Sequence, residues 1–358
     1  MSTNQRVFNF NAGPASLPLE VLEEIRDNFM NFGGMSVLEI SHRSKEFGKI
    51  LDDAKSLLKE LMGIPADHRI LFLQGGASTQ FAMIPMNLLN GSAGYSITGY
   101  WAKKAAAEAK LFGQVNEPFS SSDTNFNKTP VNGDIKVSKG SSYLHITTNN
   151  TIYGTEYNEY PETGDIPLVA DMSSDILSHK IDVNRFDLIY AGAQKNLGPA
   201  GVTVVVIRSG LAKINHRPLP AMMKYSTHVE NDSLYNTPPV FTIYSVMLVL
   251  NWIKRSGGIE GIEKRNLEKA KLIYDAIDNS TFYKGTAEKM SRSIMNITFN
   301  LPTEDLEERF IKEAELQGLV GLKGHRAIGG VRASIYNVFP IEGAKALAEF
   351  MKEFERKI

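Results

Sequence analysis

The chain has 358 residues, enough for about two domains at roughly 150 residues each. Its 39 basic and 40 acidic residues leave a net charge of -1, which gives no electrostatic basis for binding nucleic acid or an anionic membrane. The absence of cysteine excludes disulfides, thiolate metal sites and a cysteine nucleophile, and the lack of an apolar run near the N-terminus leads us to expect a cytoplasmic protein.

Helix and strand patterns alternate along the first two thirds of the chain. Apolar residues at helical spacing predict helices over 19–30 and 48–62. Short apolar runs predict strands over 69–73, 143–147, 167–170, 187–191 and 202–207. The run at 202–207 is apolar on both faces, as a buried parallel strand should be. Strands that alternate with helices are typical of βαβ units, so we expect an α/β fold with a mostly parallel sheet.

The C-terminal part has a different pattern. A long, charged amphipathic helix is predicted over 259–277, after two glycines. Further strands and helices are predicted over 293–299, 304–317, 331–336 and 341–356. We therefore expect a smaller α+β domain here. The polar segment 119–142 is predicted to be a surface loop with short strands, and apolar stretches such as 244–253 fall well short of the about 20 residues of a membrane span.

Lys195 is the first residue that suggests chemistry. It follows the predicted strand in the run DLIYAGAQKNLGPAG, at the carboxyl end where ligand sites of α/β proteins form. A lysine desolvated there can lose its proton and act as an amine nucleophile. The alternative is a loop lysine at the surface, because most lysines are exposed.

Asp171 ends the predicted strand IPLVAD, so its carboxylate is expected in the same crevice as Lys195. A lysine and an aspartate at neighbouring strand ends suit pyridoxal phosphate, with the lysine for the imine and the aspartate for the ring nitrogen. Asp171 is also a candidate N-cap, since serines follow it. We expect no metal site, because no cluster of histidines and acids accompanies Asp171.

Three further segments have weaker signals. The glycines of QGGASTQF, after the strand at 69–73, expose backbone N–H groups at a helix start and suit an anion, although a simple tight turn explains them equally well. Trp101 begins a predicted helix and is placed either to stack on a flat ring or to pack in the core. The segments around Thr151 and around Asn236 and Thr237 have turn sequences that by themselves indicate no function.

Two His-Arg pairs and one further arginine suggest anion recognition. Arginine binds carboxylate or phosphate through two parallel hydrogen bonds, so the set predicts a small substrate with two anionic groups. Solvated surface charge is the alternative. The residues are His42, Arg43, His325, Arg326 and Arg332.

Taken together, these segments closely resemble the phosphoserine aminotransferases of the class V pyridoxal-phosphate-dependent aminotransferase family, which has PLP fold type I. The resemblance runs nearly end to end through FNAGPASLP, SHRSKEF, GGASTQF, GYWA, NNTIYGT, VADMSSDILS, YAGAQKNLGPAG, YNTPPVF and KGHRAIGGVRASIYN. It implies a large domain over 16–258 with a mostly parallel seven-stranded sheet flanked by helices. It also implies a small α+β domain over 259–358, with the segment 1–15 packed on it.

The resemblance assigns roles to the residues around the cofactor. Lys195 would bind pyridoxal phosphate covalently and then move the substrate proton. Asp171 would hold the ring nitrogen, Trp101 would stack on the ring, and Thr151 would hydrogen-bond its phenolate oxygen.

The cofactor phosphate and the substrate have their own implied partners. Ala77, Ser78 and Gln194 would hold the phosphate, and Asn236 and Thr237 would reach it from a second subunit, so each site would need a homodimer. Some family members have arginine in place of Ser78, which leaves the substrate anion here to the basic residues. Arg332 would bind the α-carboxylate, and the second anion would be bound by His325, Arg326 and, from the second subunit, His42 and Arg43.

The reaction implied by the resemblance is ping-pong transamination in serine biosynthesis. L-glutamate and 3-phosphohydroxypyruvate would give 2-oxoglutarate and O-phospho-L-serine. A second reaction in pyridoxine biosynthesis, giving 4-phosphohydroxy-L-threonine, stays open. Two alternatives also remain: another class V enzyme such as an alanine–glyoxylate aminotransferase, and a non-catalytic protein that binds pyridoxal phosphate.

Overall fold

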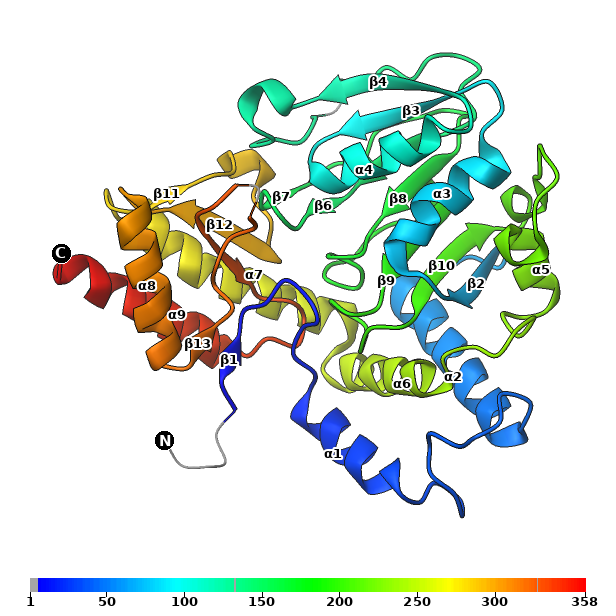
Figure 1. Ribbon diagram of the computed structural model, residues 1–358, viewed down its shortest axis with the longest axis horizontal. Coiled ribbons are helices and arrows are strands. Elements are labelled where there is room, and N and C mark those ends of the chain that lie inside the picture. Colours follow the sequence, from blue (N-terminus) through cyan, green and yellow to red (C-terminus); the bar gives the residue numbers. More distant parts are fainter. Residues whose placement is uncertain (1–5, 132, 327) are drawn as a thin grey trace.

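Seven strands form one sheet in the computed structural model, which describes residues 6–131, 133–326 and 328–358 (Figure 1). The strand order is β2-β10-β9-β8-β5-β3-β4. Every strand except β10 runs in one direction, so the predicted mostly parallel sheet is confirmed. The strands are β2 (His68–Leu73), β3 (Ser92–Ile97), β4 (Gln114–Ser120), β5 (Leu144–Thr147), β8 (Leu168–Asp171), β9 (Leu188–Gly192) and β10 (Thr203–Arg208).

The direction of β10 corrects the sequence prediction. The run at 202–207 was expected to be a parallel strand, yet β10 is antiparallel to both of its neighbours, β2 and β9. Its residues are nevertheless buried on both faces. Apolar residues on both faces of a strand indicate that it is buried between two layers of helices. Such burial does not depend on strand direction, so the pattern could not predict that β10 is antiparallel.

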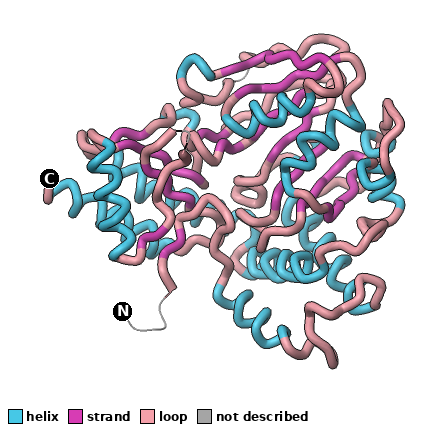
Figure 2. Tube along the Cα trace, in the orientation of Figure 1, coloured by secondary structure: helices cyan, strands magenta, loops and turns pink. Residues whose placement is uncertain are grey.

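Helices cover both faces of this sheet (Figure 2). One face packs against α2 (Lys45–Met62) and α6 (Val240–Arg255), and the other packs against α3 (Gly76–Leu88) and α4 (Tyr100–Ala109). Successive strand residues alternate between the two cores, as the strand geometry requires. Other elements of this part are α1 (Leu19–Phe29), β6 (Asn149–Asn150), β7 (Thr155–Glu156) and α5 (Tyr225–Glu230).

The C-terminal part has a core of its own beside a small antiparallel sheet. That sheet has the order β11-β12-β14, and helices pack on it. Its elements are α7 (Gly258–Asp278), β11 (Lys284–Gly285), β12 (Asn296–Asn300), α8 (Glu304–Leu316), β13 (Leu319–Val320), β14 (Val331–Ser334) and α9 (Ile341–Arg356). The predicted helices and strands are present here, with ends shifted by a few residues.

The domain limits at residues 258 and 259 stay a prediction, because α7 contributes side chains to both cores. The predicted packing of the segment 1–15 on the small domain lies partly outside the described residues. Of its described part, β1 (Phe8–Asn9) pairs with β13 in parallel (Figure 1). In the described part of the chain, no helix is both long enough and apolar enough to cross a membrane.

Candidate active site

Lys195 lies in the turn that follows β9, at the carboxyl-terminal edge of the sheet. Its Nζ donates a hydrogen bond to Oγ1 of Thr151 at 2.7 Å. Burial lowers the pKa of Lys195 to about 8, although the carboxylate of Asp171 opposes this shift. A lysine with such a pKa is partly neutral near physiological pH, so it can act as a nucleophile and exchange protons.

Asp171 is the last residue of β8 and is only 4% exposed. Its Oδ1 accepts a hydrogen bond from the backbone N–H of Ser173 at 2.9 Å. Burial raises the pKa of Asp171, while the hydrogen bonds from Ser173, the charge of Lys195 and the hydroxyl of Tyr190 lower it. The structure thus brings Asp171 and Lys195 into electrostatic contact at the ends of adjacent strands, as the sequence suggests.

The start of α3 forms an anion cradle. Gly75, between β2 and α3, has a φ of 94°, and a Cβ there would overlap with the side chain of Thr79. Ala77 and Ser78 lie in the first turn, and no side chain caps this N-terminus. The first N–H groups of a helix have no partners within the helix and carry the positive end of its dipole, which suits a phosphate.

Gln194 lies at the same edge of the sheet as this cradle. Its side chain folds over Gly192, where a Cβ would come within 2.8 Å of the amide oxygen. Its carbonyl oxygen accepts a hydrogen bond from the N–H of Ala15 at 2.9 Å. The strand that precedes Gln194, β9, packs against α3.

Trp101 is in the first turn of α4, next to the loop that carries Thr151. Gly99 caps α4 and lies so close to Asn150 that a Cβ would be 2.5 Å from its Oδ1. Asn150 in turn donates a hydrogen bond to Thr155 at 3.0 Å, within the same loop. The contact between Gly99 and Asn150 therefore fixes α4, with the partly exposed indole of Trp101, against the loop with Thr151, whose hydroxyl bonds to Lys195.

Arg332 approaches the site from β14, in the small sheet. Its charge lowers the pKa of Lys195, which places it near that amine. Burial lowers the pKa of Arg332, and its Nε is buried with no hydrogen-bond partner among the described residues. His325 lies beside it, with a ring 5.6 Å from that of Tyr100, while Arg326 is exposed. Burial and the charges of Arg332 and Arg326 lower the pKa of His325.

Four predicted residues have no described contact with Lys195, Asp171 or Arg332 within the chain. His42 and Arg43 are in the loop before α2, where the N–H of Arg43 bonds to Ser41. Asn236 and Thr237 lie against Gln74, which accepts a hydrogen bond from Asn236 at 3.5 Å and donates one to the carbonyl of Thr237 at 3.1 Å. Their predicted roles involve a second subunit, so these roles stay a prediction.

The structure also adds residues that the residue patterns did not single out. Gly13 packs on Lys195, and a Cβ there would lie 3.5 Å from the lysine Cγ. The hydroxyl of Tyr336 donates to the carbonyl of Ala12 at 2.8 Å and interacts with Thr151. Gly13 and Ala12 belong to FNAGPASLP and Tyr336 to RASIYN, and the only signal for these three residues in the sequence is the family resemblance.

Comparisons with known proteins agree with this geometry. A phosphoserine aminotransferase from Lysinibacillus sphaericus (strain C3-41) is 53% identical over 358 residues, with 99% of each chain covered. The solved phosphoserine aminotransferase from Bacillus circulans subsp. alkalophilus is 52% identical with a TM-score of 0.97, covering 98% of this chain and 99% of its own. The PLP-bound phosphoserine aminotransferase from Trichomonas vaginalis is 37% identical with a TM-score of 0.92, covering 97% and 100%. The family model described as aminotransferase class V matches residues 7–347, so the chain belongs to the class V aminotransferase family.

Proposed function

We propose that this chain is a phosphoserine aminotransferase that uses pyridoxal phosphate to transfer the amino group of L-glutamate to 3-phosphohydroxypyruvate. The products are O-phospho-L-serine, an intermediate of serine biosynthesis, and 2-oxoglutarate. The observation that carries the proposal is the buried amine of Lys195, hydrogen-bonded to Thr151 at 2.7 Å, with the charges of Asp171 and Arg332 acting on it. The full-length similarity to curated phosphoserine aminotransferases supports the same conclusion.

The residues of the site fit pyridoxal phosphate. The uncapped start of α3, with Ala77 and Ser78, would hold its phosphate together with Gln194. Asp171 would hold the ring nitrogen, and Trp101 would stack on the ring. When bound, the cofactor supplies an electron sink that stabilises negative charge at the substrate carbon bearing the amino group.

Lys195 has two tasks in this proposal. Its amine would hold the cofactor covalently, and the same amine would move a proton to and from the substrate carbon. A pKa of about 8 suits both tasks, because the amine can be neutral as a base and charged as an acid near pH 7. Thr151 orients the amine through its hydroxyl oxygen.

The substrate is held by its anions. Arg332, whose Nε is buried without a partner in the described residues, is placed to bind the α-carboxylate. His325 and Arg326 would bind the phosphate of one substrate or the distal carboxylate of the other. Ser78 lacks the charge of the arginine that some family members have there, so this distal anion relies on the His-Arg residues.

A homodimer is part of the proposal. Asn236 and Thr237 would reach the cofactor phosphate of the second subunit, and His42 and Arg43 would reach its substrate. Large apolar side chains around α1 are exposed, which is typical of an interaction surface. These are Leu19 at 56%, Phe29 at 41%, Met30 at 80%, Met35 at 49% and Leu38 at 52%. Sedimentation of the holoenzyme should show two copies, and a monomer with full activity would contradict this part.

Several finer points stay proposals. Cytoplasmic location is tested by cell fractionation. Use of the pyridoxine-pathway substrate is tested with 4-phosphohydroxy-L-threonine as amino donor.

A steady-state assay tests the function. Purified holoenzyme is given L-glutamate and 3-phosphohydroxypyruvate, and phosphoserine is quantified by mass spectrometry. We expect turnover that requires the phosphate, with pyruvate and glyoxylate as poor acceptors. Faster transfer from alanine to glyoxylate would favour the alternative class V activity. Cofactor binding without turnover on any pair would favour a non-catalytic protein.

A further inference from the structure

Asn196, the residue after Lys195, bridges two segments that are distant in the sequence. Its side chain is buried, with the residue 1% exposed. Its Nδ2 donates to the carbonyl oxygen of Ser174 at 3.1 Å. Its Oδ1 accepts a hydrogen bond from the backbone N–H of Asn337 at 3.0 Å. Both polar ends of this one amide are therefore used, each on a different part of the backbone.

These two segments carry the other charged groups of the site. Ser174 is in the turn that follows Asp171 at the end of β8. Asn337 is in the segment that continues from β14, the strand with Arg332. Asn196 itself is covalently next to Lys195. One buried side chain thus connects the backbones that present the amine, the carboxylate and the guanidinium.

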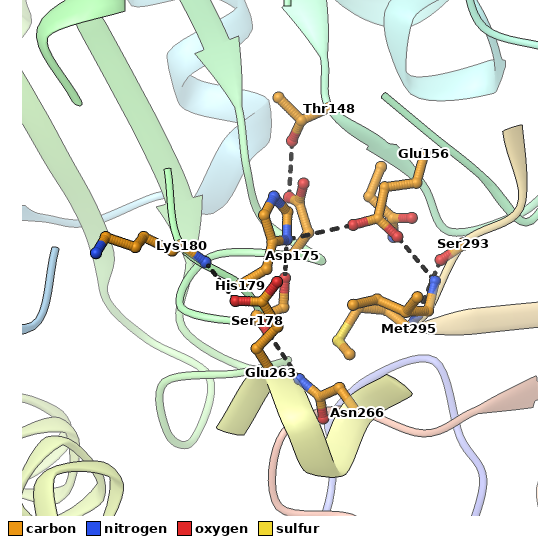
Figure 3. A network of polar contacts seen from close by, with 12 residues as sticks. Thr148, Glu156, Asp175, Ser178, His179, Lys180, Glu263, Asn266, Ser293 and Met295 are labelled. Atoms are coloured by element: carbon orange, nitrogen blue, oxygen red, sulfur yellow. Dashed lines mark hydrogen bonds and ion pairs between the residues drawn. The ribbon is translucent and has the colours of Figure 1, made fainter. Parts of the chain in front are cut away.

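A second layer of amides supports this bridge. Nδ2 of Asn337 donates to the carbonyl of Leu177 at 3.0 Å, and Nδ2 of Asn266 donates to Oδ1 of Asn337 at 2.9 Å. Asn266 also donates to the carbonyl of Ser178 at 3.0 Å (Figure 3). Leu177 has a φ of 59°, a conformation that a residue with a side chain rarely adopts. The side-chain amides of Asn337 and Asn266 therefore fix the turn after Asp171 through hydrogen bonds to its backbone carbonyls.

An amide is the side chain that this position requires. Ser174 offers a carbonyl, which needs a donor, and Asn337 offers an N–H, which needs an acceptor. An aspartate would keep the second bond and place a carboxylate oxygen against the carbonyl of Ser174. An alanine would leave both backbone groups without a partner in a buried place, which is costly.

We propose that Asn196 is a positioning residue, which sets Lys195 in register with Asp171 and Arg332. The proposal rests on the function proposed above, because it concerns the geometry of that same reaction. Small misplacement of reacting groups costs far more in rate than in binding, since proton transfer needs close alignment. Loss of the bridge should therefore lower kcat more than it raises KM.

Asn87 provides a matched control for the test. It is a buried asparagine, 1% exposed, whose Nδ2 also donates to two acceptors, the carbonyls of Met83 and Met223 at 2.8 and 2.7 Å. It lies at the far end of α3 from the anion cradle. Asn196→Ala and Asn87→Ala thus remove the same buried amide, and only the first removes a bridge at Lys195.

The experiment compares holoenzyme of the two variants with the unchanged protein. We expect Asn196→Ala to lower kcat about tenfold or more, with KM for glutamate changed less than about threefold. The pH midpoint of the visible absorption band of the resting holoenzyme should move by about half a unit or more. Asn87→Ala should lose comparable thermal stability but keep kcat and the midpoint.

Two further measurements cover a variant that does not fold and a failure of the proposed function. If Asn196→Ala does not fold, Asn196→Asp retains the bond from Asn337 and should still lower kcat about fivefold or more. The proposal is overturned if the Asn196 variant that folds keeps kcat within about twofold of the unchanged protein and its pH midpoint within about 0.2 units. If the unchanged protein does not use phosphoserine, the proposed function fails. The midpoints then decide alone: a shift in the Asn196 variant supports positioning, and equal midpoints overturn it.

Discussion

Burial makes Lys195 an unusually acidic lysine, and this should be visible as a pH dependence. Its pKa is lowered to about 8, and the carboxylate of Asp171 raises it against that effect. Only the neutral amine reacts with an aldehyde, so the rate of capture of added pyridoxal phosphate by the apoprotein should rise with pH and level off above about 8. Removing the opposing charge in Asp171→Asn should move the midpoint to lower pH.

The measurement is the growth of visible absorbance after adding the cofactor at saturating concentration between pH 6 and 10. Asp187→Asn, at a carboxylate that bonds to Arg208 at 2.8 Å, is a control that should leave the midpoint unchanged. A midpoint near the ordinary lysine pKa of about 10 would show that burial does not lower the pKa of Lys195. An upward shift in Asp171→Asn would contradict the role of its charge.

Arg332 should contribute through hydrogen-bond geometry as well as charge. Its Nε is buried, and no acceptor among the described side chains meets it. A substrate α-carboxylate can take two parallel bonds from a guanidinium, which an ammonium group cannot give. We expect Arg332→Lys to lower kcat/KM for glutamate about tenfold or more, and Arg332→Ala about 100-fold. Initial rates over a range of glutamate concentrations measure this, and equal values for lysine and arginine would contradict the two-bond arrangement.

At the scale of elements, the turn into α3 distinguishes two adjacent glycines. Gly75 has a φ of 94° and no room for a Cβ beside Thr79, whereas Gly76 has a φ of 66° with open space around it. Alanine at Gly76 should cost only the left-handed backbone, about 1–2 kcal/mol. Alanine at Gly75 should add a steric clash and shift the anion cradle.

Denaturant unfolding and the dissociation constant of pyridoxal phosphate measure these two effects. We expect Gly75→Ala to be the less stable variant and to bind the cofactor more weakly than Gly76→Ala does. Equal stability and equal cofactor affinity in the two variants would show that the close approach to Thr79 is not needed for the cradle.

The elements were predictable from sequence to different degrees. The apolar runs 167–170 and 187–191 predict buried strands, so Asp171 was correctly placed at the end of one strand and Lys195 just after the next. The direction of β10 was not predictable, because its hydrophobicity reflects two covered faces only. The hydrogen bond between Asn196 and Asn337 was also not predictable, because the sequence around a polar residue in a turn does not indicate a partner that is distant in the chain. The predicted roles of His42 and Arg43 would need a second copy of the chain, so they stay a prediction.

At the scale of the whole molecule, a buried acidic pair should make stability fall with pH. Glu156, in β7, and Asp175 lie near one another (Figure 3). Ile294 donates its N–H to Glu156 at 2.8 Å, and Thr148 donates its hydroxyl to Asp175 at 2.7 Å. Burial raises the pKa of both carboxyls, and repulsion by Asp175 raises that of Glu156 further. The Nδ1 of His179 lies 3.5 Å from the Oε1 of Glu156.

The direction of this change in stability follows from how many protons the folded and unfolded chains bind. A raised folded-state pKa means that the folded chain keeps protons which the unfolded chain releases above about pH 4. The stabilising contribution is therefore complete below that pH and is lost as pH rises through the raised values. We expect the unfolding free energy of the holoenzyme to fall between about pH 4.5 and 8, and Glu156→Gln to reduce that fall. Urea unfolding across this range measures it, and identical slopes in the two proteins would contradict the pair.

We propose that Lys195, Asp171 and Arg332 act together on a phosphorylated amino acid. The most direct measurement is the absorption spectrum of the holoenzyme after adding L-phosphoserine with no keto acid. We expect loss of the visible band and formation of the pyridoxamine form. L-serine and L-alanine should leave the spectrum unchanged, and Lys195→Ala should slow the conversion about 10³-fold. A spectrum that phosphoserine does not change, in protein that has bound the cofactor, would contradict it.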